Sequence, residues 1–163
     1  MPTHPEIRLL VRMIDEGFDA RAWHGTTLRG AVRGVTARQA AWRPSRSRHN
    51  IWEIVVHAAY WKYAVRRRLT GEKRGSFQLA GSNWFRRPAS RAGVTEAAWR
   101  ADVALLIDEH KKLRAVVEQV PRARLWTSRR GSRYTPVALV QGIAAHDLYH
   151  AGQVQLLKRL SAR

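Results

Sequence analysis

Two histidines near the C-terminal end of the chain, His146 and His150, are spaced four residues apart. On a helix this spacing places both imidazoles on one face, one turn apart, where both can reach a single ion. Both fall on the apolar seam of their segment, so we expect them to face a protein core. A buried imidazole pair without a metal must find hydrogen-bond partners or stay neutral at a desolvation cost. The pair by itself is a weak motif for a metal site.

A third histidine, His57, strengthens the prediction of a metal site. It lies between Ile54 and Trp61 on the inward seam of a different predicted helix. Three histidines from two helices would leave coordination positions open, as in catalytic sites, whereas structural sites are usually closed by four protein ligands. We therefore predict one divalent ion at His57, His146 and His150. Zinc or nickel is expected first. Manganese or iron is kept as an alternative, because ligand type alone does not decide which metal binds.

Two polar residues close to these histidines are candidates for catalytic chemistry. Glu53 precedes His57 by four residues and lies on nearly the same helix face, where it would act as a general base or orient a ligand. A salt bridge to one of the many arginines fits Glu53 equally well. Gln153 lies one turn beyond His150 and would hydrogen-bond a metal-bound water or a substrate. A polar residue at the end of a helical bundle is an equal interpretation of Gln153.

Two further residues are candidates for contacting the ligands of the site. His110 lies on the inward seam of a third predicted helix. It is a candidate for a fourth ligand, a proton shuttle or a hydrogen-bond donor to a ligand. A hydrogen-bonded core histidine is the simpler interpretation of His110. Asp147 points about 100° away from His146 on a helical wheel, so we expect it to support another imidazole rather than to bind the ion itself.

Four long segments with helical periodicity must position these residues. Their apolar residues recur at alternating steps of three and four, which is typical of amphipathic helices that face a shared core. The predicted helices cover residues 6–32, with glycines weakening the end, then 50–69, 95–120 and the segment that follows residue 135. Asn50 or Ser47, Thr95 and Thr135 are the predicted N-caps, and Pro136 suits a first helical position.

The connection between the second and third predicted helices, residues 70–94, has no helical period and contains several glycines. A segment this long without secondary structure is usually functional or a crossover. It is long enough to carry the chain across a bundle, so the second and third helices are predicted to be parallel neighbours. The predicted fold class is an all-α four-helix bundle with this long crossover. Trp84, within the crossover, is a candidate for a side chain that covers the site.

Two short segments carry a resemblance to a known family. They resemble, in order and separation, the two signature segments of the DinB/YfiT-like superfamily: WEIVVHAAYW at residues 52–61 and HDLYHAGQ at residues 146–153. These proteins are damage-inducible-type four-helix bundles regarded as metalloenzymes, unrelated to the DNA polymerase of the same name. The resemblance extends over nearly the whole chain, including the segment from Trp23 and the turn that ends at Pro44. It implies that His57, His146 and His150 match the family's three metal-binding histidines.

The resemblance also implies a class of reaction. The superfamily includes S-transferases and isomerases that use low-molecular-weight thiols such as bacillithiol or mycothiol, with the metal thought to activate the thiol. A cation lowers the pKa of a thiol or a water molecule that binds to it, which makes a nucleophile at neutral pH. We therefore expect a thiol transferase or a hydrolase acting on a small molecule, with a role in a stress response. Members of the family are often dimeric, so a homodimer is a further expectation.

Length and composition limit the interpretation further. The 163 residues predict a single domain over residues 1–163. The absence of cysteine excludes a disulfide framework, a cysteine-ligated zinc site and a thiol nucleophile supplied by the chain itself. No apolar run is long enough to span a membrane and no signal peptide is visible, so we expect a cytoplasmic protein without a membrane partner.

The charge of the chain supports an alternative function. Thirty lysines and arginines against 12 acidic residues give a net charge of +18, which favours anionic partners. The alternative is a non-catalytic basic helical bundle that binds nucleic acid or a protein partner. However, 25 of the cations are arginines spread along the chain, whereas a dedicated nucleic-acid arm would be more concentrated.

Overall fold

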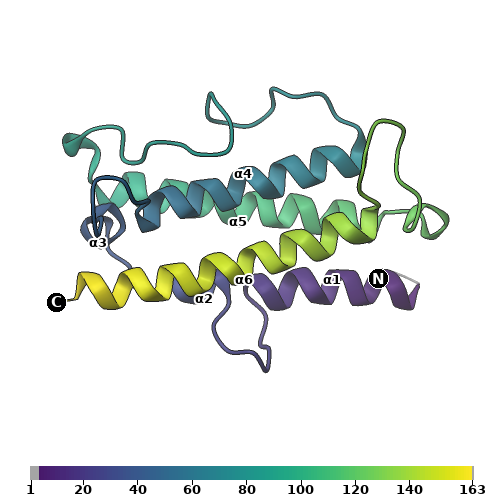
Figure 1. The fold of residues 1–163 in the computed structure, drawn as a ribbon, viewed down its shortest axis with the longest axis horizontal. Coiled ribbons are helices and arrows are strands. Elements are labelled where there is room, and N and C mark those ends of the chain that lie inside the picture. The colour runs from purple at the N-terminus through teal and green to yellow at the C-terminus, as the bar shows by residue number, and fades with distance from the viewer. Residues whose placement is uncertain (1–3, 163) are drawn as a thin grey trace.

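The computed structural model describes residues 4–162, and its regular elements are helices (Figure 1). They are α1 (Pro5–Phe18), α2 (Leu28–Val32), α3 (Ala37–Ala41), α4 (Ile51–Thr70), the 3₁₀ helix η1 (Arg91–Gly93), α5 (Glu96–Glu118), the 3₁₀ helix η2 (Arg122–Arg124) and α6 (Pro136–Ser161). No strand occurs between residues 4 and 162, so the predicted all-α class is confirmed.

Three long helices, α4, α5 and α6, begin at N-caps that the sequence predicted. The side chain of Asn50 accepts a hydrogen bond from the backbone N–H of Glu53 at 2.8 Å. Thr95 and Thr135 accept equivalent bonds, at 3.1 and 3.2 Å, from the residues three positions further on. Each bond satisfies a backbone N–H that the first helical turn leaves unpaired. These caps set where α4, α5 and α6 start.

The predicted first helix, residues 6–32, is wrong in its second half. α1 stops at Phe18, and a loop covers residues 19–27 before the short helix α2. The chain turns at Gly25, which has a φ of 101°, and Thr27 then caps α2 by accepting from the backbone N–H of Gly30 at 3.1 Å. Phe18 at the end of α1 and Leu28 at the start of α2 are both buried. Buried apolar residues on both sides of the break led to the prediction of one helix.

The long helices α1, α4, α5 and α6 lie alongside one another (Figure 1). Figure 1 shows α4 and α5 running in the same direction, because the connection between them returns along the outside of the bundle. α1, α2 and α6 run in the opposite direction, and α6 packs against α1, α2 and α4. The antiparallel packing of α4 and α6 brings the first half of α4 to the middle of α6.

The core is centred on α4, most of whose residues are buried. One cluster of buried apolar side chains surrounds its N-terminal half and includes Phe85 of the crossover and Trp99 of α5. A second cluster joins its C-terminal half to α1 and the first half of α6. Burial of this apolar surface is the main source of stability and holds α4 and α6 in place. Each helix between residues 4 and 162 is too short or too polar to cross a membrane.

Candidate metal centre

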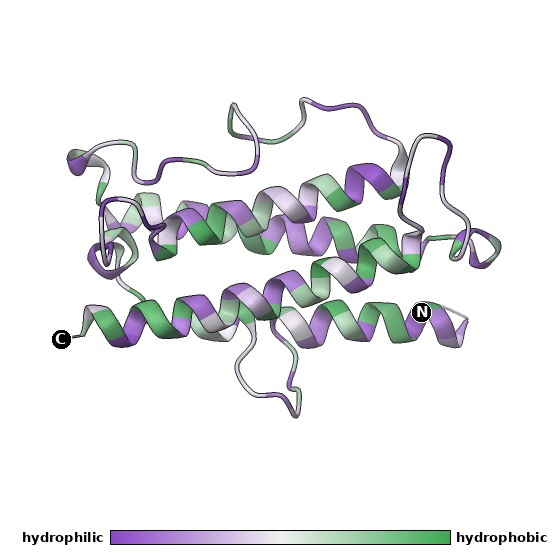
Figure 2. Cartoon of the chain, viewed as in Figure 1, coloured by the Kyte–Doolittle hydropathy of each residue, from purple (hydrophilic) through white to green (hydrophobic). Residues whose placement is uncertain are grey.

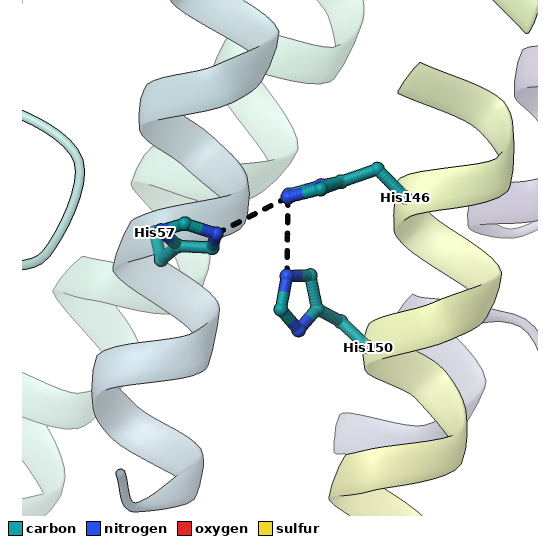
Figure 3. A group of neighbouring side chains, drawn as sticks. All are labelled: His57, His146 and His150. Atoms are coloured by element: carbon teal, nitrogen blue, oxygen red, sulfur yellow. Dashed lines mark hydrogen bonds between the residues drawn. The ribbon is translucent and has the colours of Figure 1, made fainter. Parts of the chain in front are cut away.

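His57 of α4 and His146 and His150 of α6 point their ring nitrogens toward one another (Figure 3). The Nε2 atom of His146 lies 3.1 Å from Nε2 of His57 and 3.1 Å from Nε2 of His150. One ligand nitrogen from each ring lies within 4.8 Å of the other two. His57 and His150 are buried and His146 is half-buried. The structure thus brings together the three histidines that the sequence singled out, in a group that can hold a metal ion.

Hydrogen bonds on the far side of two of the rings set which nitrogen faces the centre. Nδ1 of His57 lies 2.8 Å from the backbone carbonyl oxygen of Asn83, and Nδ1 of His150 lies 2.7 Å from the side-chain Oε1 of Gln153. Carbonyl oxygens only accept hydrogen bonds, so each Nδ1 carries the proton and donates it. Each Nε2 then presents a lone pair to the centre, which is how an imidazole binds a metal.

The centre of the group has more lone pairs than protons. The two Nε2–Nε2 contacts of 3.1 Å would need two protons to become hydrogen bonds. Only His146 has an Nε2 that is not already committed as a lone pair, and it carries one proton at most. The remaining contact sets two lone pairs against each other, which is repulsive. A cation removes that repulsion, so the donor set of three neutral imidazoles fits a divalent transition metal.

Burial keeps the three histidines neutral. It is the largest cause that lowers the pKa of His57 to about 4 and that of His146 to about 3, and it also lowers the pKa of His150. The hydrogen bond to Asn83 acts against burial at His57, and repulsion from the neighbouring imidazoles adds to burial at His57 and His146. Neutral imidazole is the form that binds a metal, so these histidines need not lose a proton near neutral pH to hold one.

The crossover between α4 and α5 reaches back over the histidines. The ring of Trp84 stacks on His57 with centroids 3.8 Å apart, and His49 stacks on Trp84 with centroids 3.6 Å apart. Asn83 has a φ of 64°, which asparagine tolerates better than most residues, and its side chain accepts from Trp61 Nε1 at 3.0 Å. Sequence patterns pointed to Trp84 but not to Asn83. An asparagine beside glycine and serine also fits an ordinary turn.

Glu53 lies apart from the three histidines. Its buried carboxylate accepts hydrogen bonds from Arg43 Nη1 at 2.9 Å and from His49 Nδ1 at 2.9 Å. Burial would raise the pKa of Glu53, but the hydrogen bonds from Arg43 and His49 outweigh burial and lower it. Glu53 therefore stays ionised, and within residues 4–162 its carboxylate makes no hydrogen bond to any of the three histidines. A salt bridge to an arginine, one of the two interpretations of the sequence, is present.

His110 and Asp147 belong to a buried polar network behind the histidines. Asp147 pairs with Lys62 of α4, and both side chains are fully buried. Nζ of Lys62 also lies 3.3 Å from Nδ1 of His110, whose Nε2 lies 3.3 Å from a carboxylate oxygen of Asp15. The network crosses the bundle from α6 through α4 and α5 to α1. Within residues 4–162, neither His110 nor Asp147 hydrogen-bonds a member of the three-histidine group.

Comparison with known proteins agrees with this geometry. Residues 21–154 match the family model described as the DinB superfamily. The chain belongs to the DinB superfamily. The match includes all of α4 and the part of α6 that carries its two histidines. No curated protein and no solved structure matches the sequence.

Two cavities of this DinB-superfamily protein end on different histidines. One has a volume of about 440 Å³ and is lined by His146 together with residues of α4 and the first half of α6, including Trp61. The other has a volume of about 550 Å³ and is lined by His150, Gln153 and Trp84 together with leucines of the second half of α6. Both volumes suit a small molecule. An ion held by the three histidines would therefore be bound to residues that line both cavities.

Proposed function

We propose that this protein is a divalent-metal-dependent enzyme that transfers a group between a low-molecular-weight thiol and a small-molecule substrate. His57, His146 and His150 would hold the ion, with zinc or nickel expected first. The observation that carries the proposal is the orientation of the rings, because hydrogen bonds to Asn83 and Gln153 turn two Nε2 lone pairs toward one point. In the described chain the group has three members, which leaves coordination positions open for a reaction.

Group transfer is favoured over hydrolysis by the two cavities. A bound ion would act as a Lewis acid that lowers the pKa of a thiol or of water. Separate cavities at His146 and His150 give each of two substrates its own approach, whereas a water molecule needs no cavity of that size. Because the chain has no cysteine, the thiol would come from a cosubstrate. Hydrolysis of a small molecule is the alternative reaction at the same site.

Roles for Gln153 and Glu53 are proposed from their contacts. Gln153 would be a positioning residue, since its Oε1 accepts from His150 while its Nε2 donates to the hydroxyl of Tyr149 at 3.0 Å. Glu53 would act as a general base by way of His49, because its own carboxylate is already bonded to that imidazole. A base that acts through His49 reaches the cavity at His150, whose lining includes both imidazoles.

His110 and Asp147 would support the site by keeping α4, α5 and α6 in register. Their buried polar network leaves little freedom for the helices to slide, because any shift would separate buried charges. A cytoplasmic location and a homodimer are further parts of the proposal, and both rest on the family resemblance.

Metal content tests the proposal first. Elemental analysis of protein purified without a histidine tag should find about one divalent ion per chain. The variant His57→Ala/His146→Ala should contain none, while the control His24→Ala, which removes an exposed histidine, should keep the ion. A wild-type protein that stays free of metal after incubation with zinc, nickel and manganese salts would overturn the proposed function.

The reaction is tested next on the metal-loaded enzyme. The wild-type enzyme should consume an activated electrophile only when a low-molecular-weight thiol is added. His57→Ala/His146→Ala should not consume it. Hydrolysis of activated esters in the absence of thiol, lost in the same variant, would favour the hydrolase instead. Neither activity in a metal-loaded protein would contradict both reactions.

A further inference from the structure

A third cavity, of about 470 Å³, lies where α4 ends and the connection to α6 passes beside it. Figure 2 colours the end of α4 and much of this connection as hydrophilic. Five of the lining residues are arginines, and this group defines the arginine cavity: Arg67, Arg68, Arg129, Arg130 and Arg133. Cations gathered around one cavity repel one another, so the arrangement favours an anion between them.

One acidic residue of the described chain, Glu72, lines the arginine cavity. It pairs with Arg66 at 2.6 Å, and its charge also interacts with that of Arg67, so it offsets part of the positive charge of the cavity. None of the five arginines forms an ion pair with a residue between 4 and 162. Arg67 and Arg129 donate only to backbone carbonyl oxygens, those of Glu72 at 3.4 Å and Leu69 at 3.3 Å. Most of the positive charge of the cavity is therefore available to a ligand.

The helix dipole accounts for only part of this cluster. The C-terminal end of α4 carries partial negative charge, which favours the arginines of its last turn. Arg129 is held at the same end, where its guanidinium lies over Gly71 so closely that an added Cβ would come within 2.5 Å of Nη1. Arg130 and Arg133 come from the other segment and make no hydrogen bond or ion pair within the described residues. These two arginines have no structural partner to explain them.

The arginine cavity shares part of its wall with the cavity that ends on His146. Arg68 and Tyr134 line both cavities. The guanidinium of Arg68 also lies over the ring of Trp61, 5.5 Å from its centroid, and Trp61 lines the cavity at His146. The two spaces therefore adjoin along α4.

Residues of α4 and α6 trace a path from the histidines to the arginines. His57, Trp61, Val65 and Arg68 are spaced by steps of four, four and three, so they share one face of α4. The helix rises about 16 Å from His57 to Arg68. On α6, Gly142 lines the cavity at His146. A Cβ added at Gly142 would meet no atom within 4 Å. The cavity at His146 is lined from His146 to Arg68 and Tyr134, so it is long enough for an extended small molecule.

We propose that the arginine cavity binds the anionic end of the small-molecule substrate, either a phosphate or a pair of carboxylates. The apolar part of the same molecule would lie against Trp61 and Val65, and its reactive end would reach the three histidines. Guanidinium groups bind phosphates and carboxylates with paired hydrogen bonds, which gives both affinity and orientation. This inference rests on the proposed function, because it names the chemical class of substrate that the metal centre would act on.

Anion binding is tested by calorimetry on the metal-loaded protein at constant ionic strength. Inorganic phosphate and succinate serve as separate probes, so the two anion chemistries are compared directly. In Arg130→Gln/Arg133→Gln we expect the Kd of the better probe to rise at least tenfold. The control Arg38→Gln/Arg100→Gln removes the same charge from exposed positions outside the cavity, and its Kd should stay within twofold of wild type.

The controls separate this inference from the proposed function. Metal content should be unchanged in both arginine variants, and anion binding should persist in His57→Ala/His146→Ala. Equal weakening in the two arginine variants would attribute the binding to net charge and overturn the inference. Anion binding that is lost only in the histidine variant would place the anion on the metal and also overturn it. So would tight binding of a single-stranded oligonucleotide that depends on Arg130 and Arg133 while neither small anion binds.

A longer probe tests whether one ligand occupies both spaces. Hexyl phosphate should bind at least tenfold more tightly than inorganic phosphate, because its alkyl chain would fill the apolar cavity beside Trp61. Gly142→Leu should cancel this gain by filling the cavity while leaving the affinity for inorganic phosphate unchanged. Gly152→Leu is the matched control on an exposed position of α6 outside that cavity. Equal affinities of the two probes for the wild type would show that the cavities do not hold one ligand.

Discussion

The backbone carbonyl oxygen of Asn83 lies 2.8 Å from Nδ1 of His57, so a residue of the crossover loop sets the tautomer of a histidine on α4. Trp84, the next residue along the loop, stacks on the same imidazole. The loop between α4 and α5 therefore orients a histidine of the candidate metal centre as well as connecting two helices. Its conformation at Asn83 should affect metal binding although no loop residue belongs to the three-histidine group.

Asn83→Val should weaken metal binding about tenfold, a magnitude typical of losing a hydrogen-bond partner of a metal ligand. The φ of 64° at this position disfavours a β-branched residue, so valine would shift the carbonyl that accepts from His57. Asn83→Gly permits the same φ and is the matched control, with an expected affinity close to wild type. Competition with a chromophoric chelator measures the affinity. Equal affinity of the valine variant and the wild type would show that the carbonyl is not needed.

Gln153→Leu should lower metal affinity by about 10- to 100-fold, because it removes the oxygen that accepts from Nδ1 of His150. Without that acceptor the ring can rotate or change tautomer. Gln153→Glu keeps an acceptor at the same place and should retain the affinity of the wild type. The same chelator competition applies. A leucine variant that binds metal as tightly as the glutamate variant would argue that Gln153 has no positioning role.

Lys62→Met should destabilise the fold by about 3–5 kcal/mol, because it leaves the carboxylate of Asp147 buried without its partner. The double variant Lys62→Met/Asp147→Leu removes both charges and should recover most of that loss. Urea unfolding of the metal-free proteins measures both free energies. A single variant no less stable than the double variant would show that the buried pair does not hold α4 against α6.

Acid should destabilise the metal-free protein before its carboxylates titrate. An unfolded histidine takes up a proton near pH 6.5, whereas the folded pKa of His57 is lowered to about 4. Protons therefore bind preferentially to the unfolded chain between these values, and stability falls as the pH drops through this window. For His57 alone the loss reaches about 3 kcal/mol by pH 4. Urea unfolding at several pH values should show that the free energy of unfolding falls less with decreasing pH in His57→Ala than in the wild type. An equal fall in the two proteins would contradict the lowered pKa of His57.

Local sequence determined the helices and the faces on which the histidines lie. Asn50, Thr95 and Thr135 cap helices because a side-chain oxygen can reach a backbone N–H three residues away without help from the rest of the chain. The spacing of His146 and His150 likewise sets their shared face, because residues four apart lie one turn apart on a helix. The break after Phe18 escaped prediction, since buried apolar residues resume in α2 while the backbone turns away between the two helices.

Tertiary structure decided which partners these local features meet. Nothing near His57 in the sequence shows that Asn83 binds its ring, and nothing near Glu53 shows that Arg43 and His49 hold its carboxylate. The arginine cavity likewise joins the end of α4 to a segment about sixty residues further along the chain. Helix formation depends on neighbours within one turn, whereas these contacts depend on the path of the whole chain through space. Helical spacing was enough to single out His57, His146 and His150 as candidate ligands, whereas their orientation toward one another depends on how the crossover and α6 pack against α4.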